Sequence, residues 1–418
     1  MFQQRSIVIC RLLLNTQQTK NVLNCKYSTT NDAVKTALYD FHVKNKGKIV
    51  NFGGYLLPVQ YADLSITGSH LHTRKNASIF DVSHMLQTEI QGADSVNLME
   101  SLCTADIQSL KDGSGTLTVY TNDNGGIIDD LIVTKVQNDH LYIVSNAARR
   151  RNDMEVILKG LENYKRKYPR ADIKVKFYEC TEKSLLALQG PKAASVLQSL
   201  VKNYDLNSLN FMESVLCQID DIDCRVTRCG YTGEDGFEIS LAAQKGAPLA
   251  EKLLKEGGEV VKLAGLGARD SLRLEAGLCL YGNDIDERTT PVEAGLTWLV
   301  GKKRRQTADF PGAVIILNQI KNKKLVERKR IGIISQKGPP ARSHTDIFCK
   351  TGLDFMKIGA TTSGSPSPSL PGCNIAMGYV ARDYAQPGLQ ILLCVRDKFY
   401  PAEIVKMPFV KTNYYTKK

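Results

Sequence analysis

The pattern of expected strands and helices changes near residue 300, and this change limits the possible folds more than any other feature. Before it, segments with the two-residue period of strands alternate with segments of helical period. After it come short strands broken by glycine and proline: Arg330–Ser335, Ile375–Val380, Gln390–Val395 and Pro401–Lys406. The earlier elements do not repeat the strand–helix–strand unit of a doubly wound sheet. We predict an α+β region over residues 31–300 and a separate all-β, barrel-like domain over residues 301–418.

The amino-terminal segment differs from the rest in charge. Residues 1–31 contain basic residues but no acid, and Asp32 is the first acid of the chain. Apolar residues around Arg11 have the spacing of one face of an amphipathic helix. This combination is typical of a mitochondrial transit peptide, which we predict over residues 1–30. A helix is expected to follow from Asp32 to Asn45, with Asp32 as its N-cap.

The net charge of +12 is concentrated towards the end of the chain. Residues 302–418 hold 21 Lys/Arg against 7 Asp/Glu, with basic clusters at Lys302–Arg305 and Lys321–Arg330. Two interpretations stay open: attraction of an anionic partner, or a solvated basic face. No stretch of about eighteen consecutive apolar residues occurs, so we predict no membrane span.

The cysteines and histidines show no metal-binding pattern. Of the 11 cysteines, Cys217, Cys224 and Cys229 form the tightest group, but their spacing is not C-x-x-C. We interpret them as reduced residues that pack in the core. His70 and His72 are one residue apart and would face different directions on a helix. We therefore predict no metal site.

Two adjacent acids interrupt an apolar strand in residues 124–133. An Asn-Gly-Gly turn predicts a hairpin between Thr116–Thr121 and Ile127–Val133. Asp129 and Asp130 then lie on opposite faces, and burying both is costly. Either one acid faces a polar cavity, where it holds a proton more readily and bonds the N–H groups of a ligand, or this is an edge strand with solvated acids.

Residues 229–240 place an acid directly after a glycine-rich turn. Gly233 and Gly236 allow tight turns, and Glu238 falls within the strand that follows. A strand glutamate can accept two parallel hydrogen bonds from the N–C–N edge of a heterocycle. The alternative is a hairpin whose glutamate points outward into solvent.

Residues 267–278 predict a helix that begins at Asp270 or Ser271 and ends at Gly277. Arg269 and Arg273 would share one face, which suits either recognition of an anion or a pair of surface ion pairs. The chain contains no G-x-G-x-x-G fingerprint, no P-loop and no G-x-S-x-G motif. Dinucleotide binding, phosphate-loop chemistry and serine hydrolysis therefore lack support.

An ordered series of motifs resembles the aminomethyltransferase family, the T-proteins of the glycine cleavage system. One such motif is weak, but the series follows the family order over residues 36–416. Its segments are 80–85, 124–133, 142–147, 187–191, 228–238, 268–287, 289–296, 362–370, 378–380 and 406–415.

The resemblance implies a three-lobed α+β fold that binds folate, with a carboxyl-terminal β-barrel domain. It also implies an enzyme, an aminomethyltransferase that moves a one-carbon unit from an aminomethylated lipoyl carrier protein (H-protein) to tetrahydrofolate. The products would be methylenetetrahydrofolate, ammonia and reduced carrier. Tetrahydrofolate would be a co-substrate, without metal or flavin. The other glycine cleavage components would be partners, and the location would be the mitochondrial matrix.

The resemblance assigns roles to particular residues. Asp130 would be the catalytic residue, next to the reactive nitrogens of folate. The other matching positions would line the folate site: Glu238, Arg269, Tyr414, Met85 and Asn146.

Other classes fit less well. Dimethylglycine and sarcosine dehydrogenases carry a similar folate module behind a flavin domain, which we do not find here. Iron–sulfur-repair relatives have a K-G-C-Y-x-G-Q-E type motif, where this chain reads G-L-C-L-Y-G-N-D. A nucleic-acid-binding protein would explain the basic end but lacks interleaved aromatic and basic residues. A folate binder without activity is disfavoured by the retained Asp130.

Overall fold

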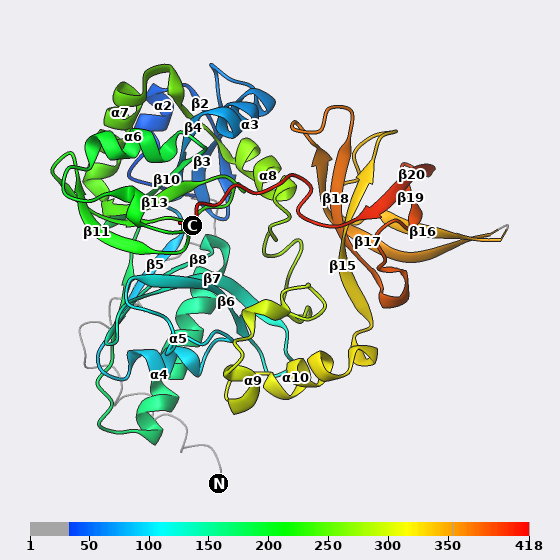
Figure 1. Cartoon of the computed structure of the whole chain (residues 1–418), viewed down its shortest axis with the longest axis horizontal. Coiled ribbons are helices and arrows are strands. Elements are labelled where there is room, and N and C mark those ends of the chain that lie inside the picture. Colours follow the sequence, from blue (N-terminus) through cyan, green and yellow to red (C-terminus); the bar gives the residue numbers. More distant parts are fainter. Residues whose placement is uncertain (1–32, 353, 418) are drawn as a thin grey trace, which may run out of the picture. The chain divides into compact units, whose positions relative to one another are not determined.

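The computed structural model describes residues 33–352 and 354–417. It contains two large sheets, each covered by helices, and a closed β-barrel formed by the last part of the chain (Figure 1). The prediction of an α+β fold with a carboxyl-terminal barrel is confirmed. The transit peptide predicted over residues 1–30 lies outside the described residues.

The first large sheet has six strands in the order β11-β12-β13-β10-β4-β14. Only β14 and β4 run parallel, and the other neighbours are antiparallel. One face packs against helices α6 and α7 through apolar side chains at alternating positions of the strands. The strands are β4 (Ala77–Asp81), β10 (Lys183–Gln189), β11 (Ser214–Ile219), β12 (Ile222–Thr227), β13 (Gly236–Ala242) and β14 (Val261–Leu263).

The second large sheet has five antiparallel strands in the order β6-β7-β8-β5-β9. The hairpin predicted around the Asn-Gly-Gly turn is confirmed as β6 and β7. Helices α4 and α5 cover the face that buries the apolar side chains. The strands are β5 (Leu86–Gln91), β6 (Ser114–Thr121), β7 (Ile127–Gln137), β8 (His140–Ser145) and β9 (Lys174–Tyr178).

The barrel closes in the order β15-β18-β17-β16-β19-β20. Every strand is therefore paired on both sides, and the barrel interior is filled by a separate apolar core. The strands are β15 (Arg328–Ser335), β16 (Asp346–Thr351), β17 (Asp354–Pro366), β18 (Asn374–Ala381), β19 (Gln390–Val395) and β20 (Lys398–Val405).

The remaining elements are a short strand, a hairpin and the helices. The short strand is β1 (Val34–Lys35), and the hairpin consists of β2 (Gly47–Phe52) and β3 (Tyr55–Tyr61). The helices are α2 (Tyr39–Lys44), α3 (Ile66–Lys75), α4 (Ser95–Glu100), α5 (Arg150–Lys167), α6 (Ala193–Leu200), α7 (Gly246–Gly257), α8 (Leu266–Glu275), α9 (Arg304–Thr307) and α10 (Ala313–Lys321). No helix of residues 33–352 and 354–417 is long and apolar enough to cross a membrane.

Two predicted helix starts are wrong. The helix expected from Asp32, which itself lies outside the described residues, begins only at Tyr39, because Val34–Lys35 form a short strand and the hydroxyl of Thr36 donates to Asp81 of β4 at 2.9 Å. Conversely, the helix expected from Asp270 begins at Leu266 after Gly265, so Arg269 lies within α8. Tertiary packing determines where both helices begin, and the local capping residues in the sequence do not indicate these positions.

Helix α8 lies between the six-stranded sheet and the barrel (Figure 1). Arg273, which is 2% exposed, connects this helix to the segment after it and to β17. Its guanidinium donates to the Asp284 carboxylate at 2.6 Å and to the Ser363 hydroxyl at 3.0 Å. The interpretation of Arg273 as part of a surface ion pair is wrong, since this arginine is buried and holds two parts of the fold together.

Replacement of Arg273 tests this connection. Arg273→Ala leaves the carboxylate of Asp284, which is 1% exposed, buried without its cation. We expect the free energy of unfolding to fall by ~3–5 kcal/mol, the usual cost of breaking a buried ion pair. Denaturant unfolding measures it. The control is Arg166→Ala, which breaks an exposed pair with Glu162 and should cost less than ~0.5 kcal/mol. Equal losses of unfolding free energy in the two variants would contradict the conclusion that Arg273 holds two parts of the fold together.

Candidate active site

A narrow cavity separates the two large sheets. One wall comes from β7 and β8, and the other comes from the strands β10, β12 and β13. Gln87 of β5 ties the walls together, because its amide oxygen accepts hydrogen bonds from Tyr142 Oη at 2.8 Å and from Ser240 Oγ at 2.5 Å. The lining residues are Ile132, Thr134, Tyr142, Val144, Leu185, Arg225, Thr227, Cys229, Glu238 and Ser240.

Asp129 and Asp130 lie on opposite faces of β7. Asp130 shares its face with Ile132, which lines the cavity, and is half-buried. Asp129 shares the other face with Leu131 and Val133, which belong to the core covered by α4 and α5, and it is 0% exposed. Because β7 is paired on both sides, by β6 and β8, the interpretation as an edge strand with solvated acids is wrong.

Asn146 joins the two acids. It follows β8 directly and precedes a short 3-10 turn, Ala147–Arg149. Its side-chain nitrogen donates to Asp129 Oδ1 and to Asp130 Oδ1, both at 2.9 Å, while its backbone N–H donates to Asp129 Oδ2 at 3.1 Å. The two carboxyl groups therefore fix the orientation of the Asn146 amide.

The environment of Asp130 favours its protonated form. Burial and the neighbouring charge of Asp129 raise the pKa of Asp130 to about 7, while the hydrogen bond from Asn146 opposes the rise. At neutral pH both forms are populated, so the group can accept a proton and give it back. This is the property expected of a general base or acid.

Glu238 lies on β13, an inner strand of the six-stranded sheet, and its side chain lines the cavity. Burial raises the pKa of Glu238, while the positive charge of Arg269 and a hydrogen bond with the Cys229 thiol act in the opposite direction. A hairpin glutamate pointing into solvent is therefore excluded. The acid is held in the protein interior beside a cation.

Arg269 lies on α8 beside the same cavity wall. Its guanidinium lies 4.7 Å from the centre of the Tyr231 ring, and Glu238 acts on it electrostatically. Burial lowers the pKa of Arg269, and the charge of Glu238 opposes this. The Nη1 atom is buried and has no hydrogen-bond partner among residues 33–352 and 354–417. Since a buried donor without an acceptor is costly, Nη1 is placed to bind a ligand.

Tyr231 lies between the two ends of the site, and the sequence analysis did not single it out. Its hydroxyl donates to the backbone oxygen of Cys279, and both Asp130 and Arg269 act on it electrostatically. Burial raises its pKa, so it stays neutral. Tyr231 is part of the motif at residues 228–238, but spacing does not distinguish it from the turn residues beside it.

The remaining predicted site residues lie farther out. Met85 packs against the cluster that includes Val144, a lining residue of the cavity. Tyr414 belongs to the carboxyl-terminal segment, where its ring stacks on Phe211 with a 4.2 Å centroid separation. The structure therefore brings Asp130 with Asn146, and Glu238 with Arg269. Tyr414 lies beside the turn that precedes β13, because Glu234 acts on it electrostatically.

Comparison with known proteins identifies the family. Residues 38–304 match the GCVT N-terminal domain, and residues 328–411 match the glycine cleavage T-protein C-terminal barrel domain. The chain belongs to the glycine cleavage T-protein family. The human mitochondrial aminomethyltransferase is 50% identical, covering 99% of this chain and 100% of that protein. The enzyme of Flaveria pringlei is 46% identical over 96% of each chain.

A solved T-protein structure has the same fold. The aminomethyltransferase T of Bartonella henselae has a TM-score of 0.82 and 37% identity, covering 92% of this chain and 100% of that one. The protein is accordingly an aminomethyltransferase of the glycine cleavage system and acts with other components of that system. The names of the relatives support a mitochondrial location.

The cysteines and histidines of this T-protein have structural roles. Cys217, Cys224 and Cys229 are free thiols, as predicted. His70 donates to Glu275 and forms a hydrogen bond with Ser271 in the interior, while His72 donates to the backbone oxygen of Val260. No group of three metal-ligating side chains occurs among residues 33–352 and 354–417.

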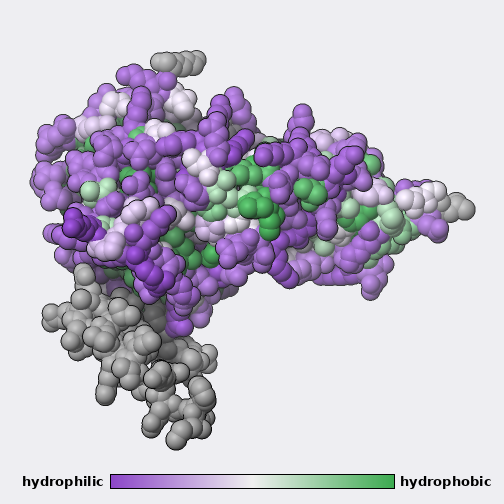
Figure 2. Space-filling model, turned by 90° about the horizontal axis from the view of Figure 1, so that it is seen from below, coloured by the Kyte–Doolittle hydropathy of each residue, from purple (hydrophilic) through white to green (hydrophobic). Residues whose placement is uncertain are grey.

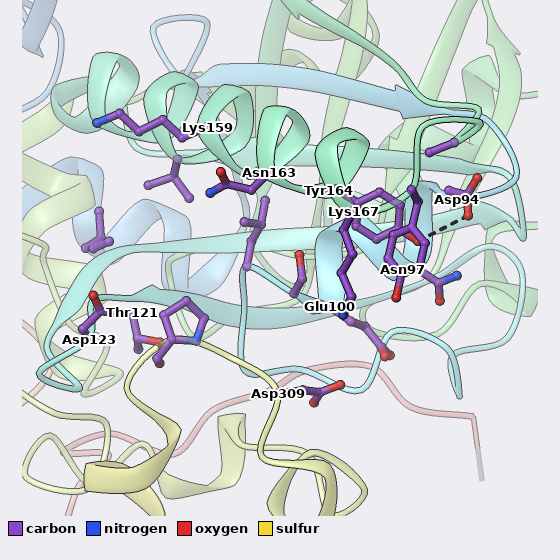
Figure 3. A pocket seen from close by; sticks show the side chains of 18 of the residues that line it. Asp94, Asn97, Glu100, Thr121, Asp123, Lys159, Asn163, Tyr164, Lys167 and Asp309 are labelled. Atoms are coloured by element: carbon purple, nitrogen blue, oxygen red, sulfur yellow. Dashed lines mark hydrogen bonds between the residues drawn. The ribbon is translucent and has the colours of Figure 1, made fainter.

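A large groove in the described part of the chain lies elsewhere. It runs beside α4 and α5 and contains both acidic and basic side chains, as Figure 3 shows for Asp94, Lys159 and Lys167. Tyr164 donates to Asp94 there at 3.3 Å. None of the predicted site residues lines this groove. Groove size therefore does not locate the T-protein chemistry.

The raised pKa of Asp130 predicts a pH-dependent stability. Its ordinary pKa is 3.8 and its folded value is about 7, so between these values the folded protein keeps a proton that the unfolded chain releases. Wild-type stability therefore falls as pH rises through this window. Asp130→Asn cannot titrate, so we expect its stability relative to wild type to increase from pH 4 to pH 7. Urea unfolding across this range measures the difference. Asp123→Asn, at an exposed position, should give a flat difference.

Proposed function

We propose that the chain transfers the one-carbon unit of an aminomethylated lipoyl carrier protein to tetrahydrofolate, with Asp130 as the catalytic residue. Glu238, Arg269 and Asn146 would bind the folate, with Met85 and Tyr414 at the margin of its site. The observation that supports this most is a carboxyl group with a pKa of about 7 beside a cavity, together with a buried Arg269 donor without a partner next to the cavity residue Glu238.

The residues of the cavity fit a pterin. Glu238 offers a carboxylate to the N–C–N edge of a heterocycle, an arrangement that gives two parallel charge-assisted hydrogen bonds. Arg269 Nη1 is a buried donor that needs an acceptor. Aromatic and apolar side chains, such as Tyr142 and Val144, supply flat contact surface on the opposite wall.

Asp130 would act on the reacting amine. A carboxylate at this position can accept the proton that a folate nitrogen releases as it attacks the aminomethyl carbon. The same negative charge stabilises a cationic carbon as ammonia leaves. Asn146 holds the carboxyl group in one orientation, which reduces the reorganisation needed during the reaction.

Asp130→Asn should abolish most turnover and leave folate binding nearly intact. The amide keeps the shape but removes the charge and the proton acceptor, so we expect a turnover loss of roughly 10²–10⁴-fold. A coupled assay with aminomethylated carrier and tetrahydrofolate measures methylenetetrahydrofolate. Asp123→Asn, in the exposed turn before β7, is the matched control and should retain activity. Turnover within a few-fold of wild type would rule out the catalytic role.

Glu238→Ala should weaken folate binding. A charge-assisted buried hydrogen bond contributes about 1.5–3 kcal/mol, so the dissociation constant should rise about 10- to 100-fold. Fluorescence titration with tetrahydrofolate measures it. Glu251→Ala removes an acid from an exposed ion pair with Lys44 and should leave the constant unchanged. Identical affinities of wild type and Glu238→Ala would show that Glu238 does not bind the pterin.

A basic and partly apolar surface would receive the carrier. Lys323, Lys324 and Lys329 are exposed, and so are Val314 (74%) and Leu325 (51%) nearby in the chain. Figure 2 shows apolar surface surrounded by hydrophilic residues on the lower side of the molecule, where α9 and α10 lie in Figure 1. The family implies an acidic carrier, which this charge would attract.

Only part of the first basic cluster contributes to this surface. Lys302 and Lys303 are exposed, whereas Arg304 is 1% exposed. The guanidinium of Arg304 donates to the backbone oxygen of Glu100 and pairs with Asp309. The carrier surface is therefore best probed through the second cluster.

Charge reversal at Lys323, Lys324 and Lys329 tests the carrier surface. We expect a higher Michaelis constant for the carrier and a weaker dependence on salt, because electrostatic attraction mainly accelerates encounter. The constant for monoglutamyl tetrahydrofolate should not change. Reversal at three exposed lysines elsewhere, Lys165, Lys202 and Lys255, is the control. If only the folate constant rises, the clusters bind the glutamate tail of the folate. If neither constant changes, this is a solvated basic face.

The division of the chain and its location complete the proposal. Residues 31–300 would form the folate-binding region, residues 301–418 the barrel domain, and residues 1–30 a transit peptide that directs the enzyme to the mitochondrial matrix. The family matches at 38–304 and 328–411 are compatible with this division.

A further inference from the structure

A second pair of acids lies behind the catalytic strand. Asp153, in the first turn of α5, and Asp129 of β7 are both 0% exposed. Helix α5 packs against β7, which places the two carboxyl groups close enough to act on each other. Two adjacent carboxylates cannot both carry a full charge inside a protein without cations close to them.

The surroundings provide few other partners for Asp153. Neither of its oxygens accepts a hydrogen bond from an N–H or O–H donor in the described residues, although Ser145 lies beside it. The charge of Arg149 acts on Asp153, but its guanidinium donates to the backbone oxygen of Ile128 and pairs with Glu287. A carboxyl group without donors needs either a proton of its own or one from a neighbour.

Asp129 differs, because both of its oxygens accept from Asn146. It can keep these two bonds and still be protonated, provided that its O–H points towards Asp153. An O–H of Asp129 that pointed towards Asn146 would compete with the N–H groups of Asn146. The position of one proton therefore decides whether Asn146 stays bound to both Asp129 and Asp130.

We propose that Asp129 and Asp153 share one proton, and that Asp153 is a positioning residue for the catalytic Asp130. Because the proton of Asp129 points towards Asp153, both oxygens of Asp129 continue to accept hydrogen bonds from Asn146. Asn146 in turn holds Asp130 by a hydrogen bond. The pair carries one negative charge that is divided between the two carboxyl groups, so that part of it remains on Asp129 next to Asp130. This inference rests on the proposed role of Asp130.

The pair also adjusts the charge state of Asp130. The ionisable groups that face Asp130 are Asp129 on its own strand, Asp153 of α5, Tyr231 after β12 and Cys279 after α8. The pair itself is faced by three further groups, which are Tyr120 of β6, Tyr281 and Arg149. Burial keeps the tyrosines and Cys279 neutral. The electrostatic effect on Asp130 thus depends mainly on where the single negative charge lies within the pair.

Two isosteric variants should shift the pH profile in opposite directions. In Asp153→Asn the amide donates to Asp129, which then carries the full negative charge next to Asp130. The limb of the pH–turnover profile that reports the titration of Asp130 should therefore move up by about 0.5–1 pH unit. In Asp129→Asn the charge is confined to Asp153, which acts less strongly on Asp130 than Asp129 does, so the limb should move down. Glu155→Gln, at an exposed position of α5, is the control and should not shift it.

A merely structural role for the pair predicts no shift, or shifts of one sign. Either result would overturn the proposal while the loss of turnover in Asp130→Asn still supported the proposed function. Infrared spectroscopy provides a test that does not depend on activity or on the variants folding. At about pH 9.5, well above the pKa of about 7 of Asp130 and above the raised value expected in Asp153→Asn, wild type should retain the carbonyl band of a protonated carboxyl group. Absence of this band would overturn the shared proton, and its loss in Asp153→Asn would support it.

Discussion

The buried charges of helix α8 hold the T-protein fold together. Glu275, 0% exposed, accepts hydrogen bonds from His70 and Arg74 of α3 on one side, each at 2.9 Å, and from Ser367 after β17 on the other at 2.6 Å. Arg273, which carries the opposite charge, connects the same helix to Asp284 and to Ser363 of β17 by hydrogen bonds. A buried charge is costly unless all of its partners are present. This network therefore connects α8 to α3 on one side and to the barrel on the other.

This arrangement also positions the residues of the proposed active site. Arg269 lies one helical turn before Arg273, so the network that fixes α8 also fixes the guanidinium beside Glu238. Asp130 comes from the other sheet, and Gln87 joins the two walls by hydrogen bonds to both. Each binding group is thus attached to a rigid element, which favours a preorganised site over one formed by mobile loops.

Several acids lie close together at the site, where the fold largely shields them from solvent. Asp129 and Asp153 are inside an apolar core, and Asp130 is next to them. Their mutual repulsion opposes ionisation, and burial adds to it. The result is a carboxyl group that can change its charge near neutral pH, at the expense of some stability. Such groups are typical of catalytic sites and are uncommon where only stability matters.

The sequence by itself determined the secondary structure around the site and the residue types in it. The turn at residues 124–126 and the strand alternation of β7 already placed Asp129 and Asp130 on opposite faces. The family motifs pointed to Asp130, Glu238 and Arg269, because these residue types recur at fixed places in an ordered series. Local patterns carry this information because side-chain direction along a strand depends only on its two-residue period.

Only the tertiary structure decided which of these residues meet. Glu238 and Arg269 are 31 positions apart, and their proximity depends on the packing of α8 against the sheet. Neither Asp153 nor Tyr231 was singled out from the sequence, although the structure brings both close to Asp130. Their roles arise from burial and from neighbours distant in the chain. Burial sets the pKa of each group, and burial is a property of the packed molecule that no local pattern contains.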